Sequence, residues 1–135
     1  MRKPKTIVLD SWAIMAYLEG ESAAERVADL ISDAHDEAAQ VLMSVVNAGE
    51  IWYIIARRAN PADADKAIRM IREIGIKFID PDWPLTKIAA SYKVKGNISY
   101  ADCFAAALAK QNKASLVTGD QEFKQLEDEI AIVWL

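Results

Sequence analysis

The stretch TIVLDS, residues 6–11, places an aspartate directly after a short run of β-branched and aliphatic residues. A short apolar run of this kind is typical of a strand buried on both faces of a parallel sheet. Ligands of open α/β sheets bind beyond the carboxyl ends of the strands. Asp10 is therefore predicted to lie at the edge of the sheet where such folds build their functional sites.

The rest of the chain alternates between two apolar patterns. Short apolar runs predict further strands at 41–43, 76–79, 115–118 and 130–134. Patterns with helical spacing predict helices at 12–18, from 24, from 45 to about 59, around 64–74, from 84 to about 95, 101–110 and 122–125. Strands that alternate with helices indicate an α/β fold whose parallel sheet is covered by helices on both faces.

Length and composition indicate one globular domain spanning residues 1–135. Hydrophobic residues make up 53% of the chain and charged residues 27%, as in folded domains. The basic segment 1–5 precedes only three apolar residues, so it does not resemble a signal peptide. Apolar runs are far too short to span a membrane. A single cysteine, Cys103, cannot form an internal disulfide, and we expect a reducing, cytoplasmic location without membrane attachment.

Taken alone, the net charge of −4 argues against a nucleic-acid partner, since phosphate binding requires positive charge. The chain has 16 basic and 20 acidic residues, so removing four candidate site acids leaves 16 of each. If those acids hold divalent cations, the site no longer repels phosphate. The net charge therefore neither supports nor excludes RNA binding.

Four acidic residues are predicted to lie near one end of the sheet. Asp10 ends the first strand, Asp120 follows the fourth, and Glu50 and Asp102 lie in the early turns of helices. Carboxylates held this close cannot all stay ionised without compensation. Mg²⁺ or Mn²⁺ provides it, because these ions favour oxygen ligands and promote attack of water on a phosphodiester.

Taken singly, each acid has a structural alternative. Asp10 and Asp120 are suitable N-caps for the short helices that follow them. Ser99 and Asp102 match the spacing of a capping box. Glu50 resembles a solvated helix residue, except that its segment is too apolar to be a free surface and an unpaired buried carboxylate is costly. The joint pattern, and no single residue, favours a metal site.

Polar and basic neighbours fit supporting roles. Four side chains are candidates for hydrogen bonds that orient the carboxylates: Ser11, Asn47, Ser99 and Thr118. Helix capping and strand-end hydrogen bonding explain them equally well. Four basic residues that border the expected site are candidates for RNA phosphate contacts, or belong to solvated helix faces: Arg57, Arg58, Lys93 and Lys95. His35, the only histidine, is expected at the surface.

Four segments in order resemble the PIN-domain family, and specifically the VapC-type toxin ribonucleases of toxin–antitoxin pairs. They span nearly the whole chain: VLDS at 8–11, SVVNAGE at 44–50, SYADCFAAAL at 99–108 and LVTGDQEF at 116–123. The family pattern carries its four acids onto Asp10, Glu50, Asp102 and Asp120, and none is missing here.

This resemblance implies a three-layer fold with a central parallel sheet of about five strands. It further implies Mg²⁺- or Mn²⁺-dependent cleavage of RNA, homodimerisation and inhibition by a cognate antitoxin protein. The resemblance implies that a water molecule attacks phosphorus and that Glu50 or Asp102 positions or deprotonates this water. Of the four acids, the one at Asp120 has the least strict position in the family pattern. The apolar helix at 44–59 would use a partner protein or a second subunit as cover for its second face.

Other function classes remain open. A phosphotransferase or phosphatase could use Asp10 as nucleophile, although a haloacid-dehalogenase-like site wants a second aspartate where this chain has Trp12. A receiver-like module would need an acceptor on a central strand, and the candidate, Asp80, is followed by Pro81. A PIN-type RNA-processing nuclease and an inactive RNA-binding module are the further alternatives, and the complete acid quartet argues against the inactive one.

Overall fold

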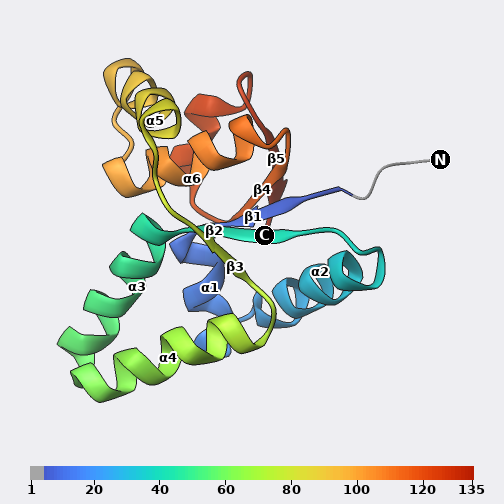
Figure 1. Cartoon of the computed structure of the whole chain (residues 1–135), viewed down its shortest axis with the longest axis vertical. Helices are drawn as coiled ribbons and strands as arrows, with labels where there is room; N and C mark the ends of the chain where they lie inside the picture. The colour runs from blue at the N-terminus through green and yellow to red at the C-terminus, as the bar shows by residue number, and fades with distance from the viewer. Residues whose placement is uncertain (1–4) are drawn as a thin grey trace.

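The computed structural model describes residues 5–135; residues 1–4 of the predicted domain, most of its basic N-terminal segment, lie outside the described residues (Figure 1). Strands and helices alternate along the described chain as the sequence predicted. The elements are β1 Ile7–Leu9, α1 Ser11–Leu18, α2 Ala24–Asp36, β2 Val41–Ser44, α3 Val45–Arg58, α4 Pro61–Glu73, β3 Lys77–Ile79, α5 Trp83–Lys95, α6 Tyr100–Gln111, β4 Ser115–Thr118, the 3₁₀ helix η1 Gln121–Leu126 and β5 Ala131–Trp134.

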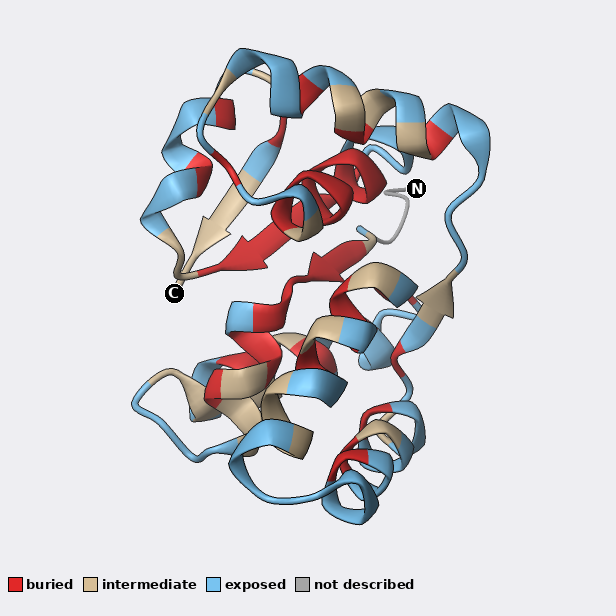
Figure 2. Ribbon diagram, turned by 90° about the vertical axis from the view of Figure 1, so that its left-hand side faces the viewer, coloured by how far each residue is buried: buried red, intermediate tan, exposed pale blue. Residues whose placement is uncertain are grey.

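The five strands form one parallel sheet in the order β3-β2-β1-β4-β5. Strand β1, which lies within the stretch TIVLDS at residues 6–11, is thus the middle strand, with β2 and β4 on its two sides. This arrangement confirms the predicted α/β fold with a central parallel sheet of about five strands. The middle strands β1, β2 and β4 are buried along their whole length, and Figure 2 shows buried strands in the middle of the sheet in red.

Side chains of the middle strands alternate between two apolar clusters, one on each face of the sheet. On one face, Val8, Leu42 and Leu116 pack with residues of α5 and α6. On the other face, Leu9, Met43 and Val117 pack with residues of α1, α2, α3 and α4. Figure 1 shows the same division, with α5 and α6 on one side of the sheet and α1 to α4 on the other.

Helix α6 lies deep in the molecule because its side chains are small. Its residues from Asp102 to Ala109 are all buried, and four of these eight are alanines. Small side chains let the helix approach both the sheet and α5, as the alanine-rich segment predicted. The same close packing fixes the position of Asp102 relative to the sheet, because Asp102 lies in the first turn of this helix.

The boundaries differ from the prediction by one to three residues. The last helix was expected over 122–125 and is a 3₁₀ helix, η1, over Gln121–Leu126. Short connecting helices often adopt this tighter form, which needs fewer residues per turn. Helix α1 ends as predicted before Gly20, whose φ of +63° is a conformation that glycine adopts without strain.

The apolar helix α3 receives part of its cover from within the chain. Ile51 is fully buried, and Ile55 packs against the same cluster. Helix α4 packs along α3, and the Trp52 indole N–H donates a 2.9 Å hydrogen bond to Asp65 of α4. Trp52 and Tyr53 nevertheless stay 36% and 44% exposed. Intramolecular packing therefore replaces part of the partner surface that the sequence suggested.

Within residues 5–135, no helix has the length and apolar character that crossing a membrane requires.

Truncation of a middle-strand side chain tests the two-cluster core. We expect Leu116→Ala to lower the free energy of unfolding by about 2–5 kcal/mol, because it leaves a cavity against α6. Val94→Ala, at a side chain that is 88% exposed, should change it by less than about 0.5 kcal/mol. Urea denaturation followed by circular dichroism measures both, and equal losses would contradict this assignment of the core.

Candidate active site

The carboxyl ends of β1 and β4 lie side by side, because the two strands pair in parallel with Leu9 opposite Val117. Asp10 directly follows β1, and Asp120 lies two residues beyond the end of β4. Parallel pairing therefore brings together two acids that are 110 positions apart in the sequence. The predicted location of the site at this edge of the sheet follows from the strand order.

Asp10 is fully buried and both of its carboxylate oxygens accept hydrogen bonds. Oδ1 accepts from the backbone N–H of Ala13 at 2.9 Å, which makes Asp10 the N-cap of α1. Oδ2 accepts from the Thr118 hydroxyl at 2.5 Å, and this hydroxyl in turn accepts from the backbone N–H of Asp120. Thr118 thus joins the ends of β1 and β4. Asp10 therefore caps α1 through one carboxylate oxygen and is held beside Asp120 through the other.

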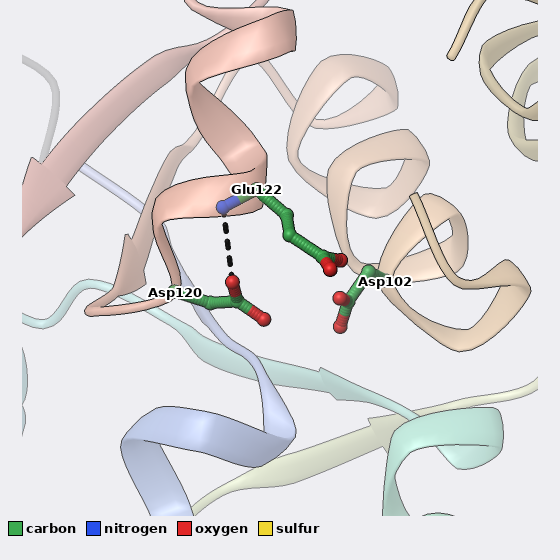
Figure 3. Close-up of side chains that lie close together, drawn as sticks. All are labelled: Asp102, Asp120 and Glu122. Carbon is green, nitrogen blue, oxygen red and sulfur yellow. Dashed lines mark hydrogen bonds between the residues drawn. The ribbon is translucent and has the colours of Figure 1, made fainter. Parts of the chain in front are cut away.

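Asp102, Asp120 and Glu122 form the tightest group of acids in the described chain. One carboxylate oxygen of each lies within 4.8 Å of those of the other two. Figure 3 shows the three side chains pointing toward one another from the start of α6 and from the turn after β4. Each backbone is held by a cap: Ser99 Oγ accepts from the Asp102 N–H at 3.2 Å, and Asp120 Oδ1 accepts from the Glu122 N–H at 3.0 Å.

Glu122 is the member of the group that the sequence reasoning missed. It lies two residues after Asp120, inside the segment that carried the family resemblance. The 3₁₀ helix η1 starts between them and turns the chain, so that the exposed Glu122 side chain returns toward Asp102. A second acid two residues after a strand-end aspartate was the available signal.

A cavity of about 420 Å³ opens beside this group. Glu50 belongs to its lining, half-buried on α3, so the prediction that its apolar segment would bury it is only partly met. Asp10 lies behind the cavity and does not line it. The lining residues are Ser11, Trp12, Met15, Ala16, Glu19, Glu21, Glu50, Ile54, Arg58, Ser99, Asp102, Asp120 and Glu122.

Burial and mutual repulsion make two of these acids reluctant to ionise. Desolvation, opposed by the hydrogen bonds from Thr118 and Ala13, raises the pKa of Asp10 to about 7. Desolvation and the negative charge of Asp120 raise the pKa of Asp102 to about 7, and the charges of Glu50 and Glu122 act in the same direction. Cations that bind near these groups would favour their ionised forms.

Asn47 ties the three helices around the site to one another. Its side-chain amide donates to the Ser11 hydroxyl at 3.3 Å and to the Ala101 carbonyl at 3.2 Å, while the Ser11 hydroxyl donates to the Asn47 carbonyl. Ser11 and Ala101 are the chain neighbours of Asp10 and Asp102. Two predicted supporting residues, Ser11 and Asn47, are therefore bonded to each other and to the backbone beside the acids. The side-chain oxygen Oδ1 of buried Asn47 has no hydrogen-bond partner among residues 5–135.

The predicted RNA-contacting residues are not gathered at the cavity. Arg58 lines it and forms an ion pair with Glu19. Arg57 lies over the ring of Tyr53 on the exposed side of α3. The Lys93 ammonium donates to the Ile98 carbonyl and Lys95 pairs with Glu129, neither of them in the lining. Contact with RNA stays a prediction for all four.

The acid group has the chemistry of a site for a hard divalent cation. Its possible ligands are all carboxylate oxygens, which Mg²⁺ and Mn²⁺ prefer. Among the described residues, no Lys, Arg or His forms an ion pair with Asp10, Glu50, Asp102, Asp120 or Glu122. Their negative charge therefore lacks a basic partner among residues 5–135, so the residues fit such a cation.

Comparison with known proteins decides the family. The family profile described as the PIN domain matches residues 7–129, which is nearly the whole chain. The chain belongs to the PIN-domain family. The resemblance inferred from the four sequence segments is thereby confirmed. Among curated protein sequences, none matches this PIN domain significantly.

Solved structures share the fold of this PIN domain at low sequence identity. A chain of the VapBC2 complex from Rickettsia felis, bound to promoter DNA, superposes with a TM-score of 0.74 at 14% identity, covering 96% of this chain and 98% of that one. VapBC-1 from nontypeable Haemophilus influenzae gives 0.71 at 18%, covering 96% and 97%. VapC20 from Mycobacterium tuberculosis, described as a sarcin–ricin loop cleaving toxin, gives 0.68 at 18%, covering 87% and 92%. The fold is that of VapC-type PIN domains.

The raised pKa of Asp10 predicts a pH-dependent stability in the absence of divalent ions. An unfolded chain releases this proton near the ordinary pKa of 3.8, whereas the folded protein retains it up to about 7. The folded state thus binds more protons between these values, and the free energy of unfolding falls as pH rises through the interval. Asp10→Asn keeps a capping oxygen and removes the charge, so we expect it to unfold with a higher free energy than wild type above pH 7.

Urea denaturation in EDTA across about pH 4 to 8 measures this difference. The exposed Asp128→Asn is the matched control, because it makes the same chemical change away from the acid group and should leave the slope unaltered. The free energy of unfolding of Asp10→Asn minus that of wild type should increase as pH rises. A difference that stays constant or decreases would contradict the prediction.

Proposed function

We propose that this PIN domain is a Mg²⁺- or Mn²⁺-dependent endoribonuclease that hydrolyses phosphodiester bonds of RNA as the toxin of a type II toxin–antitoxin pair. The observation that carries the proposal is the group Asp102, Asp120 and Glu122, whose oxygens converge beside an open cavity with no basic partner in the described chain. The fold shared with VapC-type toxins, one of them described as cleaving the sarcin–ricin loop, supports the same activity.

The acids would divide the work by their positions. Asp102, Asp120 and Glu122 converge and would hold the cation, while Asp10, fixed by Thr118 and Ala13, sets the negative potential behind them. The bound cation would supply Lewis-acid stabilisation of charge on the phosphate oxygens.

Glu50 would act as the general base. It lines the same cavity as Asp102 and Asp120 and would accept a proton from water as that water attacks phosphorus. Cleavage then breaks the bond from phosphorus to the leaving sugar oxygen. The side chains of Ser11, Asn47 and Ser99 would hold the backbone around Asp10 and Asp102 in place during this step.

The structure weakens two of the alternatives. Asp10 is fully buried with both oxygens engaged by Ala13 and Thr118, so it is poorly placed as a nucleophile for a phosphotransferase. The candidate receiver aspartate, Asp80, follows β3, which is an edge strand of the sheet rather than a central one. A PIN-type RNA-processing nuclease without a toxin role would use the same site chemistry.

Removing one acid of the converging group tests the nuclease proposal. We expect wild type to cleave RNA with Mg²⁺ or Mn²⁺ and to stop when EDTA is added. Asp102→Asn should reduce cleavage by at least about 100-fold, as loss of a group that stabilises transition-state charge does elsewhere. Asp128→Asn should cleave like wild type, and circular dichroism should show both variants folded. Undiminished, EDTA-sensitive cleavage by Asp102→Asn would count decisively against the assigned site.

The antitoxin part of the proposal has a candidate surface. An apolar groove of about 320 Å³ runs between α1, α3 and α4. Its lining is Met15, Leu18, Glu19, Ile55, Asp63, Lys66, Ala67 and Met70. Met70 is 45% exposed, so one apolar segment of a partner could cover both it and the groove.

A charge placed in this groove tests the partner proposal. If a gene beside this one encodes a small DNA-binding protein, we expect Met70→Glu to weaken the complex of that protein with this PIN domain by about 10-fold or more, because the change would place a carboxylate in an apolar contact. Titration calorimetry measures the affinity, and Val94→Glu on α5 is the control. Absence of any binding neighbour would favour the RNA-processing role over the toxin role.

A further inference from the structure

Trp12 presents an aromatic ring to the cavity that contains the acid group. It lies in the first turn of α1, two residues after Asp10, and 38% of it is exposed. It lines the same cavity as Asp102 and Asp120. An aromatic side chain that is this exposed beside carboxylates keeps part of its apolar surface out of the core, so its position calls for a further explanation.

The ring is seated on the backbone of Gly119. A Cβ atom placed on Gly119 would lie 2.3, 2.4 and 2.6 Å from Cη2, Cζ3 and Cζ2 of the indole. An atom off the ring edge would be much closer to one of these atoms than to the other two. The near equality places Gly119 over the face of the six-membered ring, so one aromatic face is covered by the turn that carries Asp120.

The glycine at this position serves the ring and not the backbone. Gly119 does not have the positive φ that favours glycine, whereas Gly20 and Gly75 do. Any other residue could adopt its backbone conformation, but its Cβ would collide with Trp12. The pair Trp12 and Gly119 therefore fixes the orientation of the indole, and the exposed part of this side chain borders the cavity.

We propose that Trp12 is a stacking platform for a nucleobase of the RNA substrate next to the scissile phosphate, where it helps to determine which nucleotides are cut. This inference rests on the proposed ribonuclease function and adds a substrate contact to it. A nucleotide combines a flat apolar base with a phosphate, which matches an aromatic face beside a cation-binding acid group. Stacking on aromatic side chains is the usual recognition of unpaired bases, so the expected substrate is a single strand or a loop.

An abasic scan of a cleaved oligoribonucleotide tests the contact. Each position around the cut site is made abasic in turn, and kcat and KM are measured for wild type, Trp12→Ala and Trp12→Phe. On intact RNA we expect Trp12→Ala to lower kcat/KM by about 5- to 100-fold, mostly through KM, and Trp12→Phe to retain most of the activity. At one abasic position wild type should fall to the level of Trp12→Ala, and Trp12→Ala should lose nothing further.

Controls separate a stacking role from a structural one. Trp12→Leu keeps apolar bulk on Gly119 without an aromatic face, and we expect the same loss of kcat/KM for it as for Trp12→Ala. If Trp12→Ala fails to fold, Trp12→Leu takes its place in the test. Trp83→Ala, at a tryptophan that is 70% exposed and outside the cavity lining, should cleave like wild type. Abasic losses that are the same in wild type and Trp12→Leu at every position would overturn the proposal, and so would full activity of Trp12→Leu.

Failure of the nuclease function gives a different result. If wild type cleaves no RNA, binding of an oligoribonucleotide is followed by tryptophan fluorescence instead. Quenching in wild type that is absent in Trp12→Phe would retain the stacking contact without the catalytic function. No quenching by RNA, or quenching that Trp12→Phe leaves unchanged, would overturn it. Quenching of the Trp12 fluorescence by a cognate antitoxin, where RNA causes none, would assign the ring to that partner and overturn the proposal.

Discussion

The hydrogen bond from the Thr118 hydroxyl to the Asp10 carboxylate is the contact on which the site depends. It joins the ends of β1 and β4, fixes the acid behind the cavity and, through the N–H of Asp120, orients the turn that carries the next acid. Only adjacent parallel strands bring these groups together, so the strand order is a requirement of the site. Burial on both faces of the sheet keeps water from competing for the bond.

Convergence of acids costs the metal-free protein stability. Asp10 and Asp102 both have raised pKa values because they are buried, and the acids around them carry charge of the same sign. Such local strain persists only where the surrounding fold is strong enough to hold it. Here that support comes from the fully buried middle strands and from α6, whose alanine side chains let the helix sit close to the sheet.

Much of the fold could be predicted from the sequence, because periodicity reports directly on which faces are buried. The stretch at 6–11 predicted a buried central strand, and Ser44 and Ser99 predicted helix starts that the structure contains. The approximate place of the acids followed from strand ends. Side-chain geometry did not follow, because the return of Glu122 depends on a 3₁₀ turn and the seat of Trp12 on a contact 107 residues away. The pairing of Lys95 with Glu129 was hidden for the same reason.

The order of the strands has a consequence for synthesis of the protein on the ribosome. Domains form as the chain emerges from the amino end, and β4 is among the last elements to emerge although it lies beside the first strand. Until it inserts, Asp10 has no Thr118 and the cavity lacks Asp120 and Glu122. A nascent chain that ends before this turn would therefore hold an incomplete set of acids, and the acid group can assemble only after β4 and Glu122 have been synthesised.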